Sequence, residues 1–211
     1  TLNKRFSRGF QFQTAYTWSK TLEWLRYLNA SDPFPAKQIG EFDRPHRFTF
    51  GGVFELPFGR GRKWIQHGIP EKLAGGWQFN LIRTFQSGEP IVLGSVDATG
   101  KDPLLPSSER NRLKWFNKDA FVNTPAFTLR SVPFRISRLK ADAINTWDLS
   151  MIKDTVLYEQ LRLQFRFEAF NAFNRAQFGM PNVSPSSTAY GQITSQANVP
   201  RSLQVALKIL F

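Results

Sequence analysis

The chain has 211 residues, no cysteine and a formal net charge of +12. The lack of cysteine excludes disulfides and cysteine-ligated metal sites, and the two histidines, His46 and His67, are far apart without a familiar zinc spacing. Positive charge first suggests nucleic acid, but the basic residues are scattered over turns and loops. We therefore expect no metal, no cofactor, no catalytic residues and no nucleic-acid partner.

No run of the chain approaches the roughly 20 apolar residues that a membrane-spanning helix needs. A barrel strand needs only about 9–11 residues, and it alternates lipid-facing with lumen-facing side chains. The informative signal is therefore an apolar side chain at every second position.

The first complete strand is expected over residues 9–20. Phe10, Phe12 and Trp18 fall on one side, and small or polar residues fall on the other. Residues 1–6 read as the end of an earlier strand, and residues 7–9 as the turn between the two. From residue 21 to residue 45 the alternation stops and prolines exclude a central strand, so we expect a long loop.

The next strand is expected over residues 47–56 and ends at the turn residues Pro57, Phe58 and Gly59. The loop before this strand contains Asp43 and Arg44. No nucleophile with an oriented base is recognisable near them, so we expect Arg44 to pair with Asp43 as an anchor of the loop.

The strand that begins at Trp77 continues its alternation past residues 87–90 and into residues 91–93. Arg83 falls on its apolar side. A lipid-facing arginine costs about 2–4 kcal/mol in mid-membrane and little near the interface, so we expect Arg83 near a rim or under a cover. Residues 95–143 have no sustained period, and we expect a structureless external loop there.

The clearest alternation is near the end of the chain. Residues 147–152 and 161–169 alternate on either side of a turn at residues 155–160, and a loop over residues 174–200 leads to a strand over residues 202–211. A helix over the last segment would place Gln204 and Lys208 inside its apolar stripe, which favours a strand.

The two sides of these strands give two sets of candidate residues. Charged residues on a strand face need water or one another, and a water-filled lumen supplies water. The candidate lumen-facing residues are Arg162, Gln164, Arg166, Glu168, Gln204 and Lys208. The candidate lipid-facing residues are Phe10, Phe12, Trp18, Phe165, Phe167, Leu207 and Ile209.

Long and short connections alternate along the chain, as they do in outer-membrane barrels with long external loops and short periplasmic turns. The predicted fold class is therefore all-β, an antiparallel meander that forms part of a transmembrane outer-membrane β-barrel. We expect about six complete strands and a periplasmic C-terminus. Six strands are too few for closure, because barrels begin at eight.

Short motifs are distributed over nearly the whole chain. They are YTWSK (16–20), FDRPHRF (42–48), ELPFGRGR (55–62), GGWQ (75–78), QSGEP (86–90), WFN (115–117), RLQFRFEAFNAFN (162–174), FG (178–179) and the closing segment 200–211. In order and spacing these motifs resemble the TonB-dependent receptors with an Oar-like β-barrel.

The resemblance implies that residues 1–211 are the C-terminal portion of such a receptor barrel in the bacterial outer membrane, with the plug and the N-terminal strands outside this segment. It implies uptake of an unidentified ligand. The implied partners are outer-membrane lipid, the barrel-assembly machinery and, only through N-terminal parts, the TonB complex. Phe211 resembles the terminal aromatic that serves as the assembly signal of outer-membrane proteins.

Two other classes remain open. An outer-membrane enzyme would need a serine, a histidine and an acid or amide held together on the wall, and both histidines lie near expected strand ends or turns, so we expect no enzyme. A soluble β-sandwich that serves as a carbohydrate-binding or adhesion module would account for the aromatic residues. It would not account for the long alternating loops or for the charged opposite faces.

Overall fold

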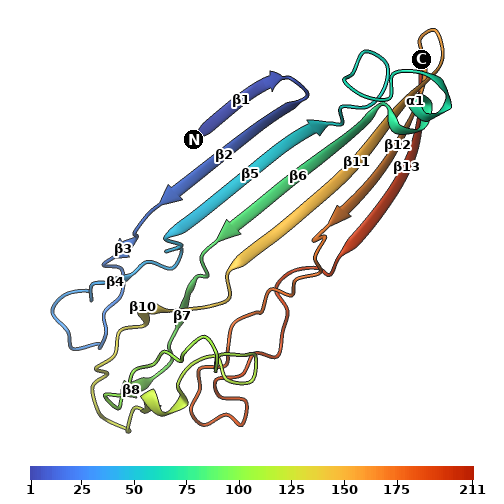
Figure 1. Ribbon diagram of the computed structural model, residues 1–211. Helices are drawn as coiled ribbons and strands as arrows, with labels where there is room; N and C mark the ends of the chain where they lie inside the picture. The colour runs from blue at the N-terminus through green and yellow to red at the C-terminus, as the bar shows by residue number, and fades with distance from the viewer.

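The computed structural model describes residues 1–211, and its main feature is one antiparallel sheet of seven strands. Figure 1 shows these strands side by side, from β1 at one edge to β13 at the other. In spatial order they are β1 (Leu2–Ser7), β2 (Phe10–Trp18), β5 (His46–Glu55), β6 (Trp77–Gln86), β11 (Ile144–Tyr158), β12 (Leu161–Phe170) and β13 (Ser202–Leu210). Spatial order follows chain order, so the predicted all-β meander is confirmed.

The tightest connection joins β1 to β2 through Arg8 and Gly9. Both residues have positive φ, at 53° and 83°. Two-residue hairpin loops favour this conformation because its twist matches that of the flanking strands, and glycine adopts it without steric cost. The turn makes Ser7 the partner of Phe10.

Three long connections lie at the opposite end of the sheet from this turn, and we call them together the loop layer. They comprise residues 19–45, 87–143 and 171–201, and they contain three small two-stranded ladders. The ladders pair β3 (Leu22–Glu23) with β4 (Gln38–Ile39), β7 (Pro90–Val92) with β10 (Arg135–Lys140), and β8 (Val96–Ala98) with β9 (Phe121–Asn123). A 3-10 helix, η1 (Lys118–Ala120), precedes β9.

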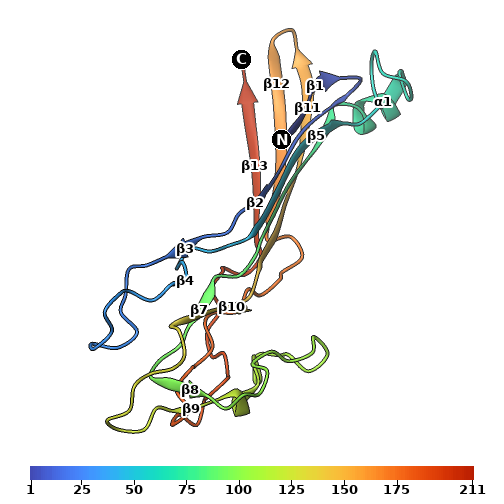
Figure 2. The ribbon, with the colours of Figure 1, turned by 90° about the vertical axis from the view of Figure 1, so that its left-hand side faces the viewer.

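The other end of the sheet carries the shorter connections. The β11–β12 turn, the helix α1 (Gly68–Ala74) and the C-terminus all lie there, as Figure 1 shows. Figure 2 shows that α1 projects to one side of the sheet and that the connection with β3 and β4 extends toward the other. Neither helical segment has the length and apolar character that crossing a membrane requires.

Three predicted boundaries are wrong. Residues 95–143 are not structureless, because β8, β9 and β10 form within them. The strand from Trp77 ends at Gln86, and residues 90–92 leave the main sheet to pair with β10. β11 runs for 15 residues to Tyr158, so the predicted turn over residues 155–160 is mostly strand. Near the end of β11 the alternation fails, because Lys153 and Thr155 lie on the apolar side and Val156 lies on the polar side, which explains why that end was missed.

The largest hydrophobic core of the molecule lies in the loop layer and not in the main sheet. Its eleven buried residues fall between Ile91 and Ile193. The main sheet is a single layer with no second sheet against it, and its apolar residues remain accessible. The alternative of a soluble β-sandwich is therefore wrong, because a sandwich buries the inner faces of two sheets against each other.

Candidate functional site

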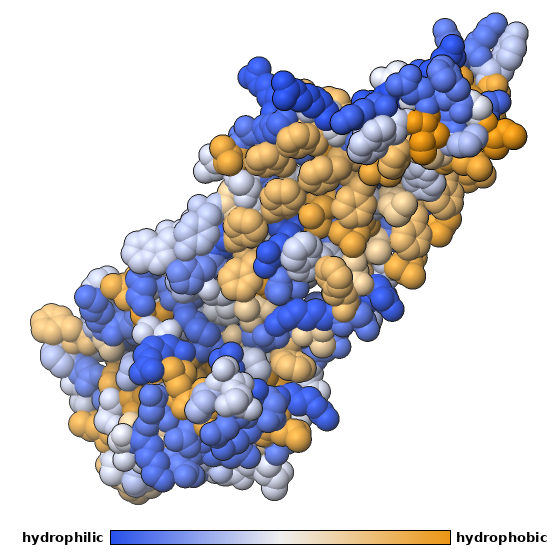
Figure 3. Space-filling model, viewed as in Figure 1, coloured by the Kyte–Doolittle hydropathy of each residue, from blue (hydrophilic) through white to orange (hydrophobic).

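The strand register places apolar side chains on one side of the main sheet, which we call the apolar face. Directly paired residues of antiparallel strands point to the same side. Phe12 pairs with Gly52, Phe167 pairs with Val205, and Phe165 pairs with Leu207. Figure 3 shows this face as a broad hydrophobic area over the sheet. All the candidate lipid-facing residues lie on it: Phe10, Phe12, Trp18, Phe165, Phe167, Leu207 and Ile209.

Many of these side chains are aromatic and contact one another across strands. Phe10 stacks on Phe54 with ring centroids 6.3 Å apart, and Phe12 stacks on Phe50 at 6.0 Å. At the far edge, in β13, Leu207 is 65% exposed and Ile209 is 62% exposed. A wide exposed apolar area of this kind requires a non-aqueous partner.

Three basic residues lie on the apolar face, and each has a specific compensation. Arg83 lies over the rings of Phe48 and Trp147, with its guanidinium 5.7 Å and 4.6 Å from their centroids. It is three residues from the end of β6 at the loop layer. Of the two predicted alternatives, a rim or a cover, the contacts show a cover of two aromatic rings, whose faces attract a desolvated guanidinium.

Lys4 and Lys153 are compensated by backbone carbonyls. Lys4 donates to the carbonyl of Ser7 at 3.2 Å and lies 3.8 Å from the ring centroid of Phe10. Lys153 donates to three carbonyls at the C-terminal end of α1. Sequence reasoning did not single out these two lysines, although each interrupts an apolar alternation in the way that Arg83 does.

The opposite side of the sheet, the polar face, carries all the candidate lumen-facing residues: Arg162, Gln164, Arg166, Glu168, Gln204 and Lys208. Arg166 pairs with Glu168 at 2.9 Å. Gln164 donates to the Asp154 carboxylate at 3.0 Å. These contacts form a ladder of charges and amides along β12, as expected for a wall that meets water.

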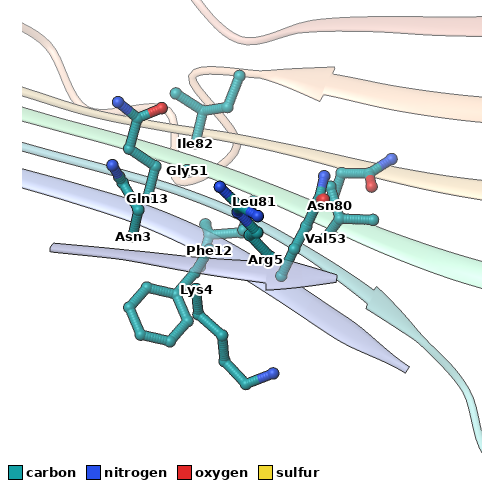
Figure 4. A pocket seen from close by; sticks show the side chains of 12 residues that line it. Asn3, Lys4, Arg5, Phe12, Gln13, Gly51, Val53, Asn80, Leu81 and Ile82 are labelled. Carbon is teal, nitrogen blue, oxygen red and sulfur yellow. The ribbon is translucent and has the colours of Figure 1, made fainter. Parts of the chain in front are cut away.

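A shallow hollow of about 450 Å³ lies on the polar face across β1, β2, β5 and β6. Figure 4 shows Gln13 and Ile82 on the side of the hollow, whereas Phe12 and Lys4 point to the other side. The polar side chains that line it are Asn3, Arg5, Gln11, Gln13 and Asn80. Beyond it, Asn80 donates to the Ser150 hydroxyl at 2.9 Å, so amide contacts continue across the sheet.

The loop layer has its own packed interior. Phe116 is fully buried and contacts Tyr190 edge to face with ring centroids 5.3 Å apart. Trp115 donates its indole N–H to the Lys140 carbonyl at 2.9 Å. Burial, with a smaller contribution from Asp119, raises the pKa of the Tyr190 hydroxyl to about 12. The loop layer is therefore a folded unit that covers one end of the wall.

Polar contacts join separate segments of the loop layer to one another. Lys140 of β10 donates to the Asp43 carboxylate at 2.6 Å, and Asp43 is 1% exposed. Burial alone would raise the pKa of Asp43, but the hydrogen bonds from Lys140 and from the Thr21 backbone outweigh it, and the pKa lies below its ordinary value. The Asp97 pKa is likewise lowered, by hydrogen bonds from the hydroxyl and backbone N–H of Ser131.

The predicted pairing of Arg44 with Asp43 is wrong, because Asp43 pairs with Lys140 and Arg44 pairs with Glu89 at 2.6 Å. Adjacent residues of an extended chain point to opposite sides, so Arg44 and Asp43 reach different partners. Both still anchor the loop. Nearby, the close approach of residues 88 and 141 requires glycine at position 88, since a Cβ atom there would lie 1.9 Å from the Ala141 carbonyl oxygen.

A second charged cluster surrounds Arg135, whose side chain is 2% exposed. Its guanidinium donates to Glu23 at 2.6 Å and to Glu41 at 3.1 Å. Arg175 pairs with Asp142 at 2.9 Å. These residues were missed in the sequence because they occur singly in irregular segments, with partners up to 112 residues away.

The histidines and carboxylates do not form a metal site. No three of the histidines and carboxylates are close enough to hold a metal ion. His46 lies beside Tyr16, and the Tyr16 hydroxyl is 2.8 Å from the Nδ1 atom of His46. The two residues lie at the loop-layer end of β5 and β2, where aromatic and amphipathic side chains meet a membrane interface.

Comparison with protein families agrees with this geometry. The model of a family described as "Outer membrane beta barrel domain" matches residues 1–204. Searches of curated proteins and of solved structures found no match. The match covers the main sheet except residues 205–210, which are most of β13. This chain therefore belongs to the family of outer membrane beta barrel domains.

Proposed function

We propose that the chain is part of the wall of a TonB-dependent receptor of the Oar-like type, which takes up a ligand across the outer membrane. The observation that carries the proposal is the folded loop layer at one end of a wall with one polar and one apolar face. Simple pores require only a polar lumen, whereas a receptor also needs an ordered external surface that recognises a ligand.

In this proposal the apolar face meets outer-membrane lipid and the polar face meets the lumen. The loop layer is external, so the short-turn end and the C-terminus are periplasmic. The open edges at β1 and β13 pair with further strands of a larger barrel, because unpaired backbone groups are not tolerated in lipid. Residues 1–211 are then one portion of the receptor, and the TonB complex acts through parts outside it. The ligand is unidentified, and the wall carries no enzymatic activity.

Electrical conductance of the full-length native protein in planar bilayers tests this proposal. A plugged receptor passes no steady potassium chloride current because the folded plug fills the lumen. Urea opens it, because only non-covalent contacts keep the plug folded there. Binding of the native protein to the purified periplasmic domain of TonB is measured in parallel. Steady current before urea, together with no TonB binding, would identify a passive pore and overturn the receptor proposal.

A further inference from the structure

The connection between β5 and β6 is unusual among the short-end connections because it exposes large apolar side chains. Four large apolar residues are exposed there: Trp64 (50%), Ile65 (42%), Ile69 (76%) and Leu73 (68%). We call residues 60–74 the rim segment. Exposed apolar side chains that cluster in one short segment mark an interaction site.

The rim segment is attached to the apolar face and not to the polar face. Lys153 donates to the carbonyls of Lys72, Leu73 and Gly75 at 2.9, 3.0 and 2.7 Å. The indole of Trp77 donates to the same Leu73 carbonyl at 3.0 Å. Lys153 and Trp77 are paired on the apolar face, where Trp77 also contacts Phe165 edge to face. These bonds hold the last turn of α1 against the lipid-facing side of the wall.

The figures agree with this position. α1 lies on the viewer's side of the strands in Figure 1, which is the side that Figure 3 shows as hydrophobic. Figure 2 shows α1 projecting to one side of the strands, at the end of the sheet away from the loop layer. Hydrophobic atoms in Figure 3 continue from the sheet to the corner that α1 occupies. The exposed apolar surface of the rim segment therefore continues the apolar face.

The depth of the rim segment follows from the register. Lys153 pairs with Trp77, the first residue of β6, so the last turn of α1 is level with the end of that strand. β11 continues for five more residues, to Tyr158. The rim segment thus lies beside the end of the apolar band and not beyond the hairpin tip. Headgroups of a bilayer occupy this level.

The charge of the rim segment suits an anionic surface. Arg60, Arg62, Lys63 and Lys72 are all exposed, and Glu71 is its one carboxylate. Arg62 pairs with Glu55, which leaves the other three cations without an ion-pair partner. Lys63 lies over the Trp64 ring, 5.2 Å from its centroid. Basic residues interleaved with tryptophan, leucine and isoleucine are typical of segments that lie in a membrane interface.

We propose that the rim segment is a lipid-binding element that inserts Ile69 and Leu73 at the headgroup–acyl boundary and binds anionic phospholipid phosphates through Arg60, Lys63 and Lys72. It anchors the wall at the short-turn end. The periplasmic phospholipid leaflet is its partner, and this choice of leaflet rests on the orientation proposed above. Continuity with the lipid-facing side of the wall favours lipid over a protein partner.

A fluorophore at a single introduced cysteine tests insertion, and this segment contains no native cysteine. The full-length native protein carries Ile69→Cys or, as the matched control, Phe127→Cys, which lies fully exposed in the loop layer. Both are reconstituted into phosphatidylcholine vesicles with phosphatidylglycerol. We expect blue-shifted emission and quenching by brominated lipid at position 69 and neither effect at position 127. Emission that is neither blue-shifted nor quenched at both positions, as from a fluorophore in water, would overturn the proposed insertion.

Charge reversal tests the phosphate contacts. Lys63→Glu combined with Lys72→Glu should reduce the quenching at position 69 in vesicles with phosphatidylglycerol and leave it unchanged in pure phosphatidylcholine. Reversal of Lys101 and Lys114, two exposed lysines of the loop layer, is the control and should change nothing. Equal quenching in both lipids for all variants would overturn anionic recognition. Neither readout depends on TonB binding or conductance, so the uptake proposal can fail while this one stands.

Discussion

Lys140 and Asp43 form a buried ion pair with 2.6 Å between Nζ and Oδ2, although 97 residues separate them. Lys140 also donates to the Asp43 backbone carbonyl at 2.7 Å. The pair joins β10, within the longest connection, to the segment that leads into β5. One contact thereby joins two of the long connections of the loop layer, next to the start of β5.

Replacement of Asp43 by Asn should loosen the loop layer without preventing barrel formation. Removing one partner of a buried pair leaves an uncompensated charge, at a cost of about 3–5 kcal/mol. Hydrogen exchange should increase in residues 19–45 and 135–143 of the native protein. Lys101→Met breaks an exposed pair and should cost at most about 1 kcal/mol. Equal exchange in the two variants would show that the buried pair does not hold the layer.

The same pair predicts how the loop layer responds to acid. The folded pKa of Asp43 is depressed below its ordinary value of 3.8. A depressed carboxyl pKa contributes stability that is fully present above the unfolded pKa and is lost as pH falls through the folded pKa. The protection factors of residues 19–45, which are corrected for the intrinsic pH dependence of amide exchange, should therefore stay constant from neutral pH to about pH 5 and fall below about pH 4. Asp43→Asn should weaken that acid response.

Lys153→Met should release α1 while the wall still assembles. The substitution removes three hydrogen bonds to the C-terminal carbonyls of α1 and also removes a cation from the apolar face. We expect faster exchange in residues 68–75 and an unchanged folded yield in outer-membrane fractions. The control is Lys208→Met on the polar face, which should leave α1 protected. Protection of α1 in both variants would contradict the role of Lys153.

Leu207→Arg should impair membrane assembly more than Gln204→Arg. Leu207 pairs with Phe165 on the apolar face, where an arginine costs about 2–4 kcal/mol at mid-membrane. Gln204 pairs with Glu168 on the polar face, so an arginine there gains a carboxylate neighbour. Folded yield in outer-membrane fractions measures the difference. Similar yields would mean that the two faces have been assigned to the wrong environments.

Deletion of Phe211 should slow or abolish insertion and leave ligand affinity unchanged in the protein that still assembles. Phe211 follows β13 directly, and its side chain is 100% exposed, so its loss removes no packing within the described chain. Pulse-chase measurement of surface protein reports the insertion rate. Normal surface levels after deletion would mean that Phe211 is an ordinary residue of the wall and carries no assembly signal.

Local alternation along the chain was sufficient to predict the six long strands and which side of each is apolar. A strand presents successive side chains to opposite sides, so Leu207 and Gln204 separate without knowledge of any partner strand. It was also sufficient to place Arg83 among apolar residues and to require some compensation for it. The ends of β6 and β11 were less well predicted, because pairing with neighbours decides where a strand stops.

Tertiary structure alone decided how the charges and the loops are arranged. The partners of Asp43, Arg44 and Arg135 come from distant segments, and no local pattern encodes which carboxylate a given cation reaches. The core around Phe116 forms only when two separate connections, residues 87–143 and 171–201, fold together, so its residues show no period along the chain. The attachment of α1 to the apolar face depends on Lys153, which lies about 80 residues further along the chain. Contacts across such distances depend on the register of the sheet, and the register exists only once the strands have paired.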